Sequence, residues 1–514
     1  MEKHEKTNSL ESRDSPELLE IEVKEAAGLP DDFVPATPEE EAAVIRKLDW
    51  RLLPFVFLLY MLAVLDRSNL GNARLAGLED AIDLEGWNYN WLGTPSLPTM
   101  HGKWLTCSAG TIFYIAYICS QWMLTGWKIF PPHIFCACAV LFWGFIATIQ
   151  ATVFNWAGLM VCRFFLGVAE AMFGPGVPLY LSFFYPREKI GFRHGVFIAG
   201  AAMANAYGGA LAYALSHIHN SVAPWKLLFI IEGLPTCLLA VVTWWWLPDN
   251  IGTTRFLNAR QKQIASVCVA RNQQADPHGS GFKIKECLAA FKEPKSLLPA
   301  FMYFGYNVSF ASLPLFVPTI ISQLGFTGVI SNGLSSPPYL LCFFTILGIT
   351  WLSDRVGMRG PFIVLCSWTA AVGFLLQANL SGTTARYIGV FLTIQIFVCV
   401  PLTLAWVANI HQTESKRAGG NVILATIGQF GPLLGTNVFP NSDKPFFRKG
   451  MWISAAMCIF VGCLAIILSC ILIAENKSME RKGLIPKKGE EGREPVQHGV
   501  AGEEAKVPRY RYIW

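Results

Sequence analysis

The stretch AGLMVCRFFLGVAEAMFGPGVPLY, residues 157–180, is long and apolar enough to form one membrane-crossing helix, yet it carries Arg163 and Glu170. About 20 predominantly apolar residues match the hydrocarbon thickness of a bilayer. Ionisable side chains are costly at that depth, so those that occur there are candidates for function. The segment raises two questions: how many spans surround it, and why it keeps one charge of each sign.

The composition predicts an all-α polytopic membrane protein. Of the 514 residues, 53% are hydrophobic and only 15% are charged. A soluble protein of this size would need far more charged surface. The formal charge of +5 gives no indication of a nucleic-acid partner. The 14 cysteines form no CxxC pair, so we interpret them as packing residues and expect neither a metal site nor another cofactor.

Apolar windows predict twelve transmembrane helices in two six-helix bundles. The expected spans are 51–69, 110–127, 134–151, 157–180, 194–215 and 226–247, then 297–318, 334–353, 361–379, 386–408, 419–438 and 451–473. The expected domains are a disordered cytoplasmic tail (1–45), an N-terminal bundle (46–247), a central cytoplasmic loop (248–295), a C-terminal bundle (296–474) and a second cytoplasmic tail (475–514). Two bundles that rock about a site between them can expose it to either side of a membrane.

Basic residues predict that both tails lie in the cytoplasm. The short loops on the side of the tails carry Lys128, Arg187, Lys189, Arg193, Arg355, Arg359, Lys416 and Arg417. The loops on the other side are poorer in Lys and Arg, apart from the last one. An excess of Lys and Arg marks the cytoplasmic side of a membrane protein.

The second expected span begins irregularly. Residues 94–110, TPSLPTMHGKWLTCSAG, separate NWLG from TIFYIAY, which would otherwise read as one helix entry. A retained intron or a local insertion explains this interruption, and so does an ordinary longer loop. Both interpretations stay open.

Charges inside the predicted spans are the main site candidates. Arg163 and Glu170 are seven residues apart, so they share a helix face at a separation of about 10 Å along the axis. Asp66 and Arg67, on the first span, could lie between them, and the four charges sum to zero. The alternative is structural, with Arg163 reaching the interface and Glu170 bonding a neighbouring helix. Glu232 is expected near the membrane interface, and for this residue a structural role is preferred over a functional one.

Uncharged polar residues supply further candidates for substrate binding. Tyr303 and Asn307 are four residues apart and share a helix face, and Gln395 lies in the middle of a span. Asn205 and Gln429 occur in stretches rich in small residues. Each of these side chains could instead make a hydrogen bond between helices.

Several motifs together identify a family resemblance. They are DWRLLPFVFLLYMLAVLDRSNLGNARLAGLE (49–79), RFFLGVAEAMFGPGVPLYLSFFYPREKIGFRHG (163–195), WKLLFIIEGLPT (225–236), WLSDRVGMRGP (351–361), AWVANIHQTESKRAGGN (405–421) and the terminal YRYIW. The chain resembles the major facilitator superfamily over about residues 45–475. Within it, the chain is similar to the anion:cation symporters, in the fungal branch that includes allantoate and nicotinate permeases.

The resemblance implies a proton-driven symporter for a small organic anion, such as a vitamin or a nitrogen-source acid, in the plasma membrane. By the same resemblance, Asp66 and Glu170 would take up protons, Arg67 would contact the substrate carboxylate, and Arg163 would couple the two. The resemblance also assigns Asp354, Arg355 and Arg359 to a gating loop. The matching loop of the first half, WKIFPPHIF (127–135), departs from the signature.

Other functions stay open within this fold. The charges do not decide between import of a nutrient and export of a secondary metabolite. A transport-dead nutrient sensor is a further alternative. An enzyme is not expected, because the sequence contains no HExxH, GxSxG or P-loop motif.

Overall fold

The computed structural model describes residues 36–78, 81, 111–186, 189–217, 222–273, 291–411, 414–439, 443 and 446–482. Within these residues the chain is helical and contains no β-strand. The interrupting segment 94–110 and most of both predicted tails lie outside the described residues. The predicted all-α polytopic fold is confirmed.

The helices fall into two sets that are joined by the segment containing α12 (Ala259–Gln273). The first set comprises α3 (Pro38–Ala73) with η2 (Arg74–Leu78), helical residues 111–119, η3 (Gln121–Thr125), α6 (Gly126–Ile129), α7 (Pro132–Ile149) with η4 (Gln150–Thr152), α8 (Trp156–Phe173), α9 (Gly176–Leu181), α10 (Ile190–Leu215) and α11 (Pro224–Trp246). The second set comprises α14 (Pro294–Ser322), α15 (Gly328–Val356), α16 (Gly360–Asn379), α17 (Thr383–Thr393), η6 (Ile394–Val398), α18 (Cys399–Ile410), α19 (Glu414–Gly428), α20 (Phe430–Gly435) and α21 (Arg448–Arg481).

Ten helical segments in the described part are long and apolar enough to cross a membrane, and each coincides with one expected span. The two other expected spans, 110–127 and 419–438, are divided into shorter helices. In the second of these, the division between α19 and α20 falls at Gln429, next to Gly428 and close to Pro432. Glycine weakens a helix and proline lacks the N–H group that continues it, so both residues are compatible with a break there.

The helices extend beyond the boundaries expected from hydropathy. Helix α3 already begins at Pro38, so residues 38–45 are helical where a disordered tail was expected. Its start is fixed by reciprocal bonds, since Thr37 N–H donates to Glu40 and Glu40 N–H donates to the Thr37 hydroxyl. Helix α21 likewise continues to Arg481. Hydropathy marks the apolar part of a helix, whereas polar turns outside the membrane lengthen it.

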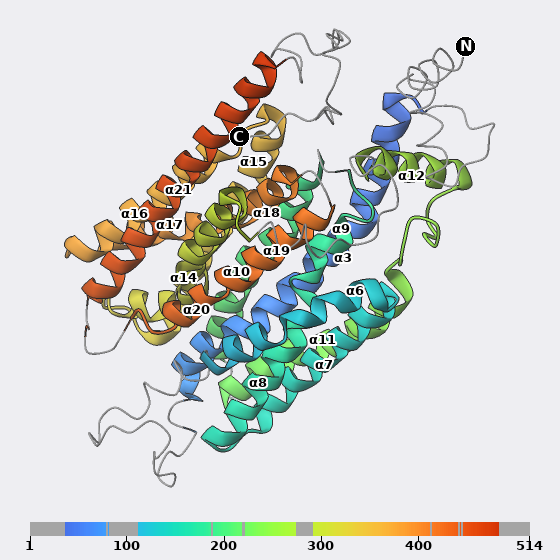
Figure 1. Ribbon diagram of the computed structural model, residues 1–514. Coiled ribbons are helices and arrows are strands. Elements are labelled where there is room, and N and C mark those ends of the chain that lie inside the picture. The colour runs from blue at the N-terminus through green and yellow to red at the C-terminus, as the bar shows by residue number, and fades with distance from the viewer. Residues whose placement is uncertain are drawn as a thin grey trace, which may run out of the picture.

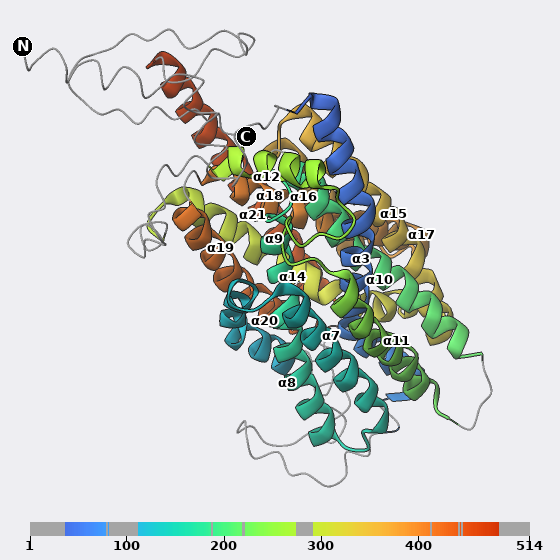
Figure 2. The ribbon, with the colours of Figure 1, turned by 90° about the vertical axis from the view of Figure 1, so that its right-hand side faces the viewer.

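The two sets lie side by side (Figures 1 and 2), with α3 to α11 on one side and α14 to α21 on the other. Helix α10 packs along α15, and α3 packs against α14, which joins the two halves. We call the end of the bundle where α3 begins and α21 ends the terminal end, and the other end the opposite end. Helix α12 lies across the terminal end.

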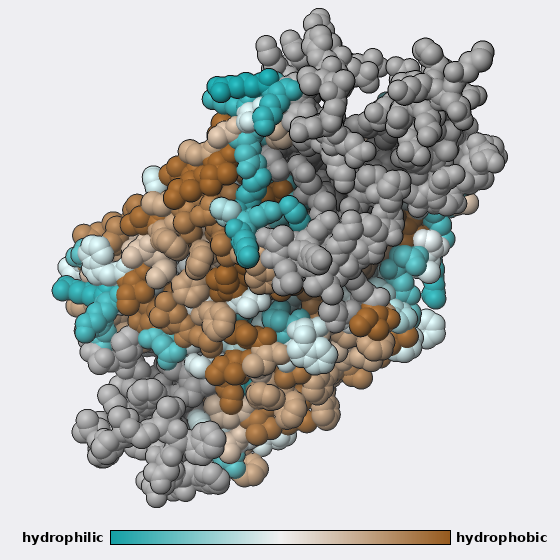
Figure 3. All heavy atoms as spheres, in the orientation of Figure 1, coloured by the Kyte–Doolittle hydropathy of each residue, from teal (hydrophilic) through white to brown (hydrophobic). Residues whose placement is uncertain are grey.

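Apolar side chains cover the sides of the bundle. Figure 3 shows hydrophobic residues across the flank, with hydrophilic ones toward the ends. Helix α11, for example, exposes Leu238, Val241 and Trp245. Large exposed apolar surfaces of this kind mark contact with a membrane.

Candidate functional site

A buried ion pair joins α3 to α8. The Arg67 guanidinium donates from Nε and Nη2 to one oxygen of Glu170, Oε2, at 3.0 and 2.5 Å. The Glu170 side chain is 1% exposed and that of Arg67 is 18% exposed. Charge-assisted hydrogen bonds are stronger than neutral ones, and this pair is screened from water. The structure thus brings together two of the four charges that the sequence singled out.

Three aromatic rings surround the Arg67 guanidinium. Its central carbon lies 5.0 Å from the ring of Phe113, 5.3 Å from that of Tyr117 and 6.0 Å from that of Tyr114. All three belong to the helical residues 111–119, and positions three and four apart share a helix face. Sequence analysis missed this aromatic cage, although the spacing of FYIAY contains the signal. Cation–π contacts hold a guanidinium in place without neutralising it.

Arg163 contacts the backbone of α3 and not the Asp66 carboxylate. Its Nη1 donates to the carbonyl oxygens of Asp66 and Arg67 at 3.3 and 3.4 Å. Both Asp66 carboxylate oxygens are buried without a hydrogen-bond partner among the described residues, and so are Nε and Nη2 of Arg163. The four charges are therefore not one evenly bonded network. They form one tight pair, Arg67–Glu170, beside Arg163 and Asp66, whose charged groups are not bonded to each other.

A small cavity lies next to these charges, at the junction of the two halves. Its volume is about 20 Å³, which is close to the space of a single water molecule. The first half contributes Arg67, Ser68, Arg163 and Asn205 to its lining, among others, and α14 contributes Phe310, Ala311, Pro314 and Leu315. Both arginines thus face a space that both halves enclose.

Among the uncharged candidates, Asn205 on α10 lines this cavity, whereas Tyr303, Asn307 and Gln395 lie in the second half and do not line it. Asn307 donates to the carbonyl of Gly428 at 3.1 Å, which ties α14 to α19. Gln395, in η6, donates to the carbonyl of Phe391 in the preceding α17 at 3.1 Å. Tyr303 stacks edge-on to Tyr306, with 5.1 Å between the ring centroids.

At the terminal end, the predicted gating loop joins the two halves. Arg359 donates to Asp354 at 2.7 Å, and the backbone N–H of Phe192, in the first turn of α10, donates to Asp354 at 2.6 Å. A carboxylate at a helix N-terminus is favoured by the helix dipole. Arg355 does not take part, because it is exposed and lies over the Trp351 ring at 5.4 Å.

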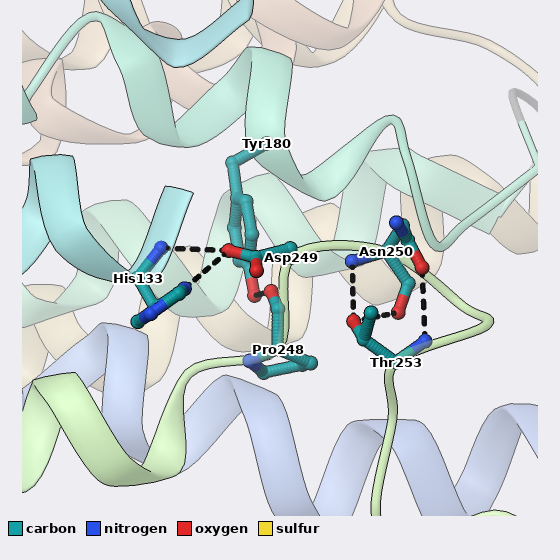
Figure 4. Close-up of polar contacts among 6 residues, drawn as sticks. All are labelled: His133, Tyr180, Pro248, Asp249, Asn250 and Thr253. Carbon is teal, nitrogen blue, oxygen red and sulfur yellow. Dashed lines mark hydrogen bonds and ion pairs between the residues drawn. The ribbon is translucent and has the colours of Figure 1, made fainter. Parts of the chain in front are cut away.

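The first half has a different polar cluster at its terminal end (Figure 4). The backbone N–H of His133 donates to Asp249 at 3.0 Å, and the ring Nδ1 lies 2.7 Å from the same oxygen. The Tyr180 hydroxyl donates to the Pro248 carbonyl at 2.7 Å. These bonds join α7, α9 and the segment after α11. The sequence showed that this half departs from the loop signature. It did not identify these residues, which join the helices at this end in place of a loop of the signature type.

At the opposite end, small residues let the halves approach closely. A Cβ atom added at Gly71 would lie 2.9 Å from the Pro314 carbonyl oxygen, and one added at Gly209 would lie 2.6 Å from that of Asn332. The hydroxyl oxygens of Thr111 and Thr436 are 3.1 Å apart. The halves therefore touch at both ends, with the small cavity between the two contact regions.

Comparison with known proteins agrees with this architecture. The family described as Major Facilitator Superfamily matches residues 56–436. The high-affinity nicotinic acid transporter of Saccharomyces cerevisiae is 29% identical over 487 residues, covering 94% of this chain and 87% of the relative. The MFS transporter prlL of a fungal species is 30% identical over 448 residues, covering 84% and 87%. The major facilitator-type transporter hxnP of Emericella nidulans is 29% identical over 443 residues, covering 83% and 86%.

Solved structures share the fold at low sequence identity. The xylose transporter XylE from E. coli, in a partially occluded inward open conformation, superposes with a TM-score of 0.57 at 13% identity, covering 81% of this chain and 97% of that one. A D-xylose–proton symporter gives a TM-score of 0.60 at 12% identity, with the same coverage. With the family match extending over most of the helical region, the chain belongs to the Major Facilitator Superfamily of membrane transporters.

Proposed function

We propose that this protein is a secondary transporter that carries a small organic anion, a carboxylate, in symport with protons. The observation that carries the proposal is the Arg67 guanidinium, which is held at the junction of the two halves with Glu170 as its anionic partner. A guanidinium is suited to binding a carboxylate through two parallel hydrogen bonds. A substrate carboxylate would therefore compete with Glu170 for the same N–H groups.

This competition couples the proton to the substrate. While Glu170 is ionised, it occupies Arg67. Once Glu170 takes up a proton, its attraction for Arg67 falls, and a substrate carboxylate can replace it. Proton and anion then load together, and the site keeps the same net charge. A buried site that stays neutral avoids most of the cost of placing a charge in a low-dielectric medium.

The contacts at the two ends support alternating access. The Asp354–Arg359 pair and the Phe192 amide close the α10–α15 contact at the terminal end. Gly71 and Gly209 close the opposite end. We propose that substrate enters from one side when one contact region opens and leaves when the other does, with Asp354 and Arg359 acting as the latch of the terminal end. Tyr303, Asn307 and Gln395 remain proposed contacts for a larger cavity.

We further propose a plasma-membrane location with both termini in the cytoplasm. The excess of basic residues in loops at the terminal end supports this orientation. One relative carries nicotinic acid by name, so nicotinate is the first substrate to test. Pantothenate and allantoate extend the test to other small carboxylates.

The experiment is uptake of these three radiolabelled acids by a yeast strain without carboxylate permeases of its own. Accumulation of at least one acid that a protonophore abolishes is the expected result. Arg67→Ala should abolish it, whereas Asp249→Asn, at the terminal end, serves as the matched control away from the site. Membrane vesicles of inverted orientation distinguish an exporter. If no acid moves in either direction while the protein is present in the membrane, the proposal is wrong.

A further inference from the structure

Glu232 is a third buried carboxyl group near the charges of the site. It lies on α11 and is 2% exposed, well inside a helix long and apolar enough to cross the membrane. Neither of its carboxylate oxygens has a hydrogen-bond partner among the described residues. A buried polar group without a partner is costly and requires an explanation.

Glu232 belongs to the neighbourhood of Arg163. The Arg163 guanidinium carbon lies 5.9 Å from the ring of Phe229, which precedes Glu232 by three residues on α11 and shares its helix face. Asp66 and Arg163 are the charged groups within electrostatic range of Glu232, and Glu232 is likewise within range of Arg163. Asp66 and Glu232 thus share one arginine.

The hydrogen-bonding capacity of the three groups is complementary. Arg163 has unpartnered donors at Nε and Nη2, and both carboxyl groups beside it have unpartnered acceptors. A charge-assisted hydrogen bond from Arg163 to one of these carboxylates would satisfy both partners. Arg163 carries only one positive charge, so it can neutralise one of the two carboxylates and not both.

The count of charges then requires a bound proton. The buried cluster contains three carboxyl groups (Asp66, Glu170 and Glu232) and two guanidinium groups (Arg67 and Arg163). With every group ionised, the sum would be one negative charge in a low-dielectric interior, which is strongly unfavourable. Glu170 accepts two hydrogen bonds from Arg67 and is therefore the carboxylate that stays ionised in this arrangement. The proton is left for Asp66 or Glu232.

We propose that Asp66 and Glu232 share one proton and compete for Arg163, which makes Glu232 a third proton-carrying group of the transporter. When Glu232 holds the proton, the Asp66 carboxylate pairs with Arg163. When the proton moves to an oxygen of Asp66, the Glu232 carboxylate pairs with Arg163 instead. In this exchange the proton passes from Glu232 to Asp66, while the pairing with Arg163 passes from Asp66 to Glu232. The net charge of the cluster is unchanged. The inference rests on the proposed symport, to which it adds a proton-holding site beside Glu170.

Infrared spectroscopy of the purified full-length protein at neutral pH tests the bound proton without any substrate. A protonated carboxyl group has a carbonyl band that a carboxylate lacks. We expect one such band in the unmodified protein and its loss in Glu232→Gln and in Asp66→Asn, because removing either acid lets the remaining charges balance. Asp249→Asn, which removes a partly exposed carboxylate, should leave the band unchanged. If Glu232→Gln folds and keeps the band, the inference is wrong.

Size-exclusion chromatography reports whether each variant is folded. Should Glu232→Gln fail to fold, Asp66→Asn carries the test alone, and retention of the band then overturns the inference. A structural role that leaves Glu232 permanently ionised predicts no change of the band in Glu232→Gln.

Proteoliposomes loaded with nicotinate separate this inference from the proposed function. In Glu232→Gln we expect nicotinate exchange at equilibrium to persist, while accumulation driven by a pH gradient falls at least tenfold or shifts its pH profile. Accumulation and a pH profile like those of the unmodified protein would overturn the role of Glu232 alone. Absence of all carboxylate transport in the unmodified protein would overturn the proposed function, and the infrared result would still decide where the proton lies.

Discussion

Replacing Gly71 with valine should force the opposite end of the transporter open. A Cβ atom at this position would lie 2.9 Å from the Pro314 carbonyl oxygen and 3.1 Å from both the Cα and the carbonyl oxygen of Leu315. Ordinary contact begins at 3.4 Å, so even the first carbon requires a shift of 3.4 − 2.9 = 0.5 Å. The obstructing atoms are helix backbone, which cannot rotate away as a side chain can.

The size of the expected shift between the closed and open states follows from the free-energy cost of overpacking. Extra methyl groups in a packed interface cost about 1–3 kcal/mol. Because the clash exists only while α3 and α14 touch, the whole cost falls on the state that is closed at the opposite end. A difference of about 1–3 kcal/mol shifts the equilibrium between two states by a factor of about 5–150. Valine at position 71 should therefore raise the ratio of open to closed molecules at this end by that factor.

Thiol labelling measures this fraction without a known substrate. Ser68 lines the central cavity and is 4% exposed, so Ser68→Cys is protected while the opposite end is closed. In cells, a membrane-impermeant maleimide should label Ser68→Cys faster by about the factor given above when Gly71→Val is added. The same labelling without Ser68→Cys gives the background from native cysteines.

The matched control is Gly348→Val. Gly348 also lies within a helix, α15, but a Cβ atom there has no neighbour within 4 Å. Both substitutions place a β-branched residue in a helix, so they share any general effect of valine on helix stability. Equal labelling rates for the two variants, or a rate for Gly71→Val equal to that of the parent, would refute the reasoning.

Three further substitutions test the site and its latch. Glu170→Gln should retain carboxylate exchange in proteoliposomes but lose accumulation driven by a pH gradient, because glutamine cannot carry the proton; intact accumulation would contradict this. Arg67→Lys should raise the KM for uptake at least tenfold, since a lysine ammonium lacks the planar pair of parallel N–H donors with which a guanidinium binds a carboxylate, and an unchanged KM would remove Arg67 from substrate binding. Asp354→Asn should weaken closure of the terminal end by about 1–3 kcal/mol, because a neutral amide accepts a weaker hydrogen bond from the Phe192 N–H of α10 than a carboxylate does, seen as faster labelling of Ser68→Cys from the cytoplasmic side of inverted vesicles.

Hydropathy was sufficient for the architecture because membrane insertion depends mainly on the local composition of each segment. Ten expected spans coincide with helical segments that are long and apolar enough to cross a membrane. The two divided spans were recognisable as apolar segments, but their breaks were not, because Gly428 and Pro432 only weaken a helix and packing decides where it ends. The early start of α3 was readable in retrospect from the Thr37–Glu40 capping box.

The sequence by itself determined which ionisable groups enter the membrane, since a charge inside an apolar run is visible without any structure. It could not determine their partners. Whether Arg67 meets Glu170, Asp66 or a ring of aromatic residues depends on how each helix is rotated and shifted along its neighbours. That rotation is set by packing over the whole interface, and in spans that are apolar on every side no single residue specifies it. Only the tertiary structure therefore separated the tight Arg67–Glu170 pair from Arg163 and brought Glu232 into the same cluster.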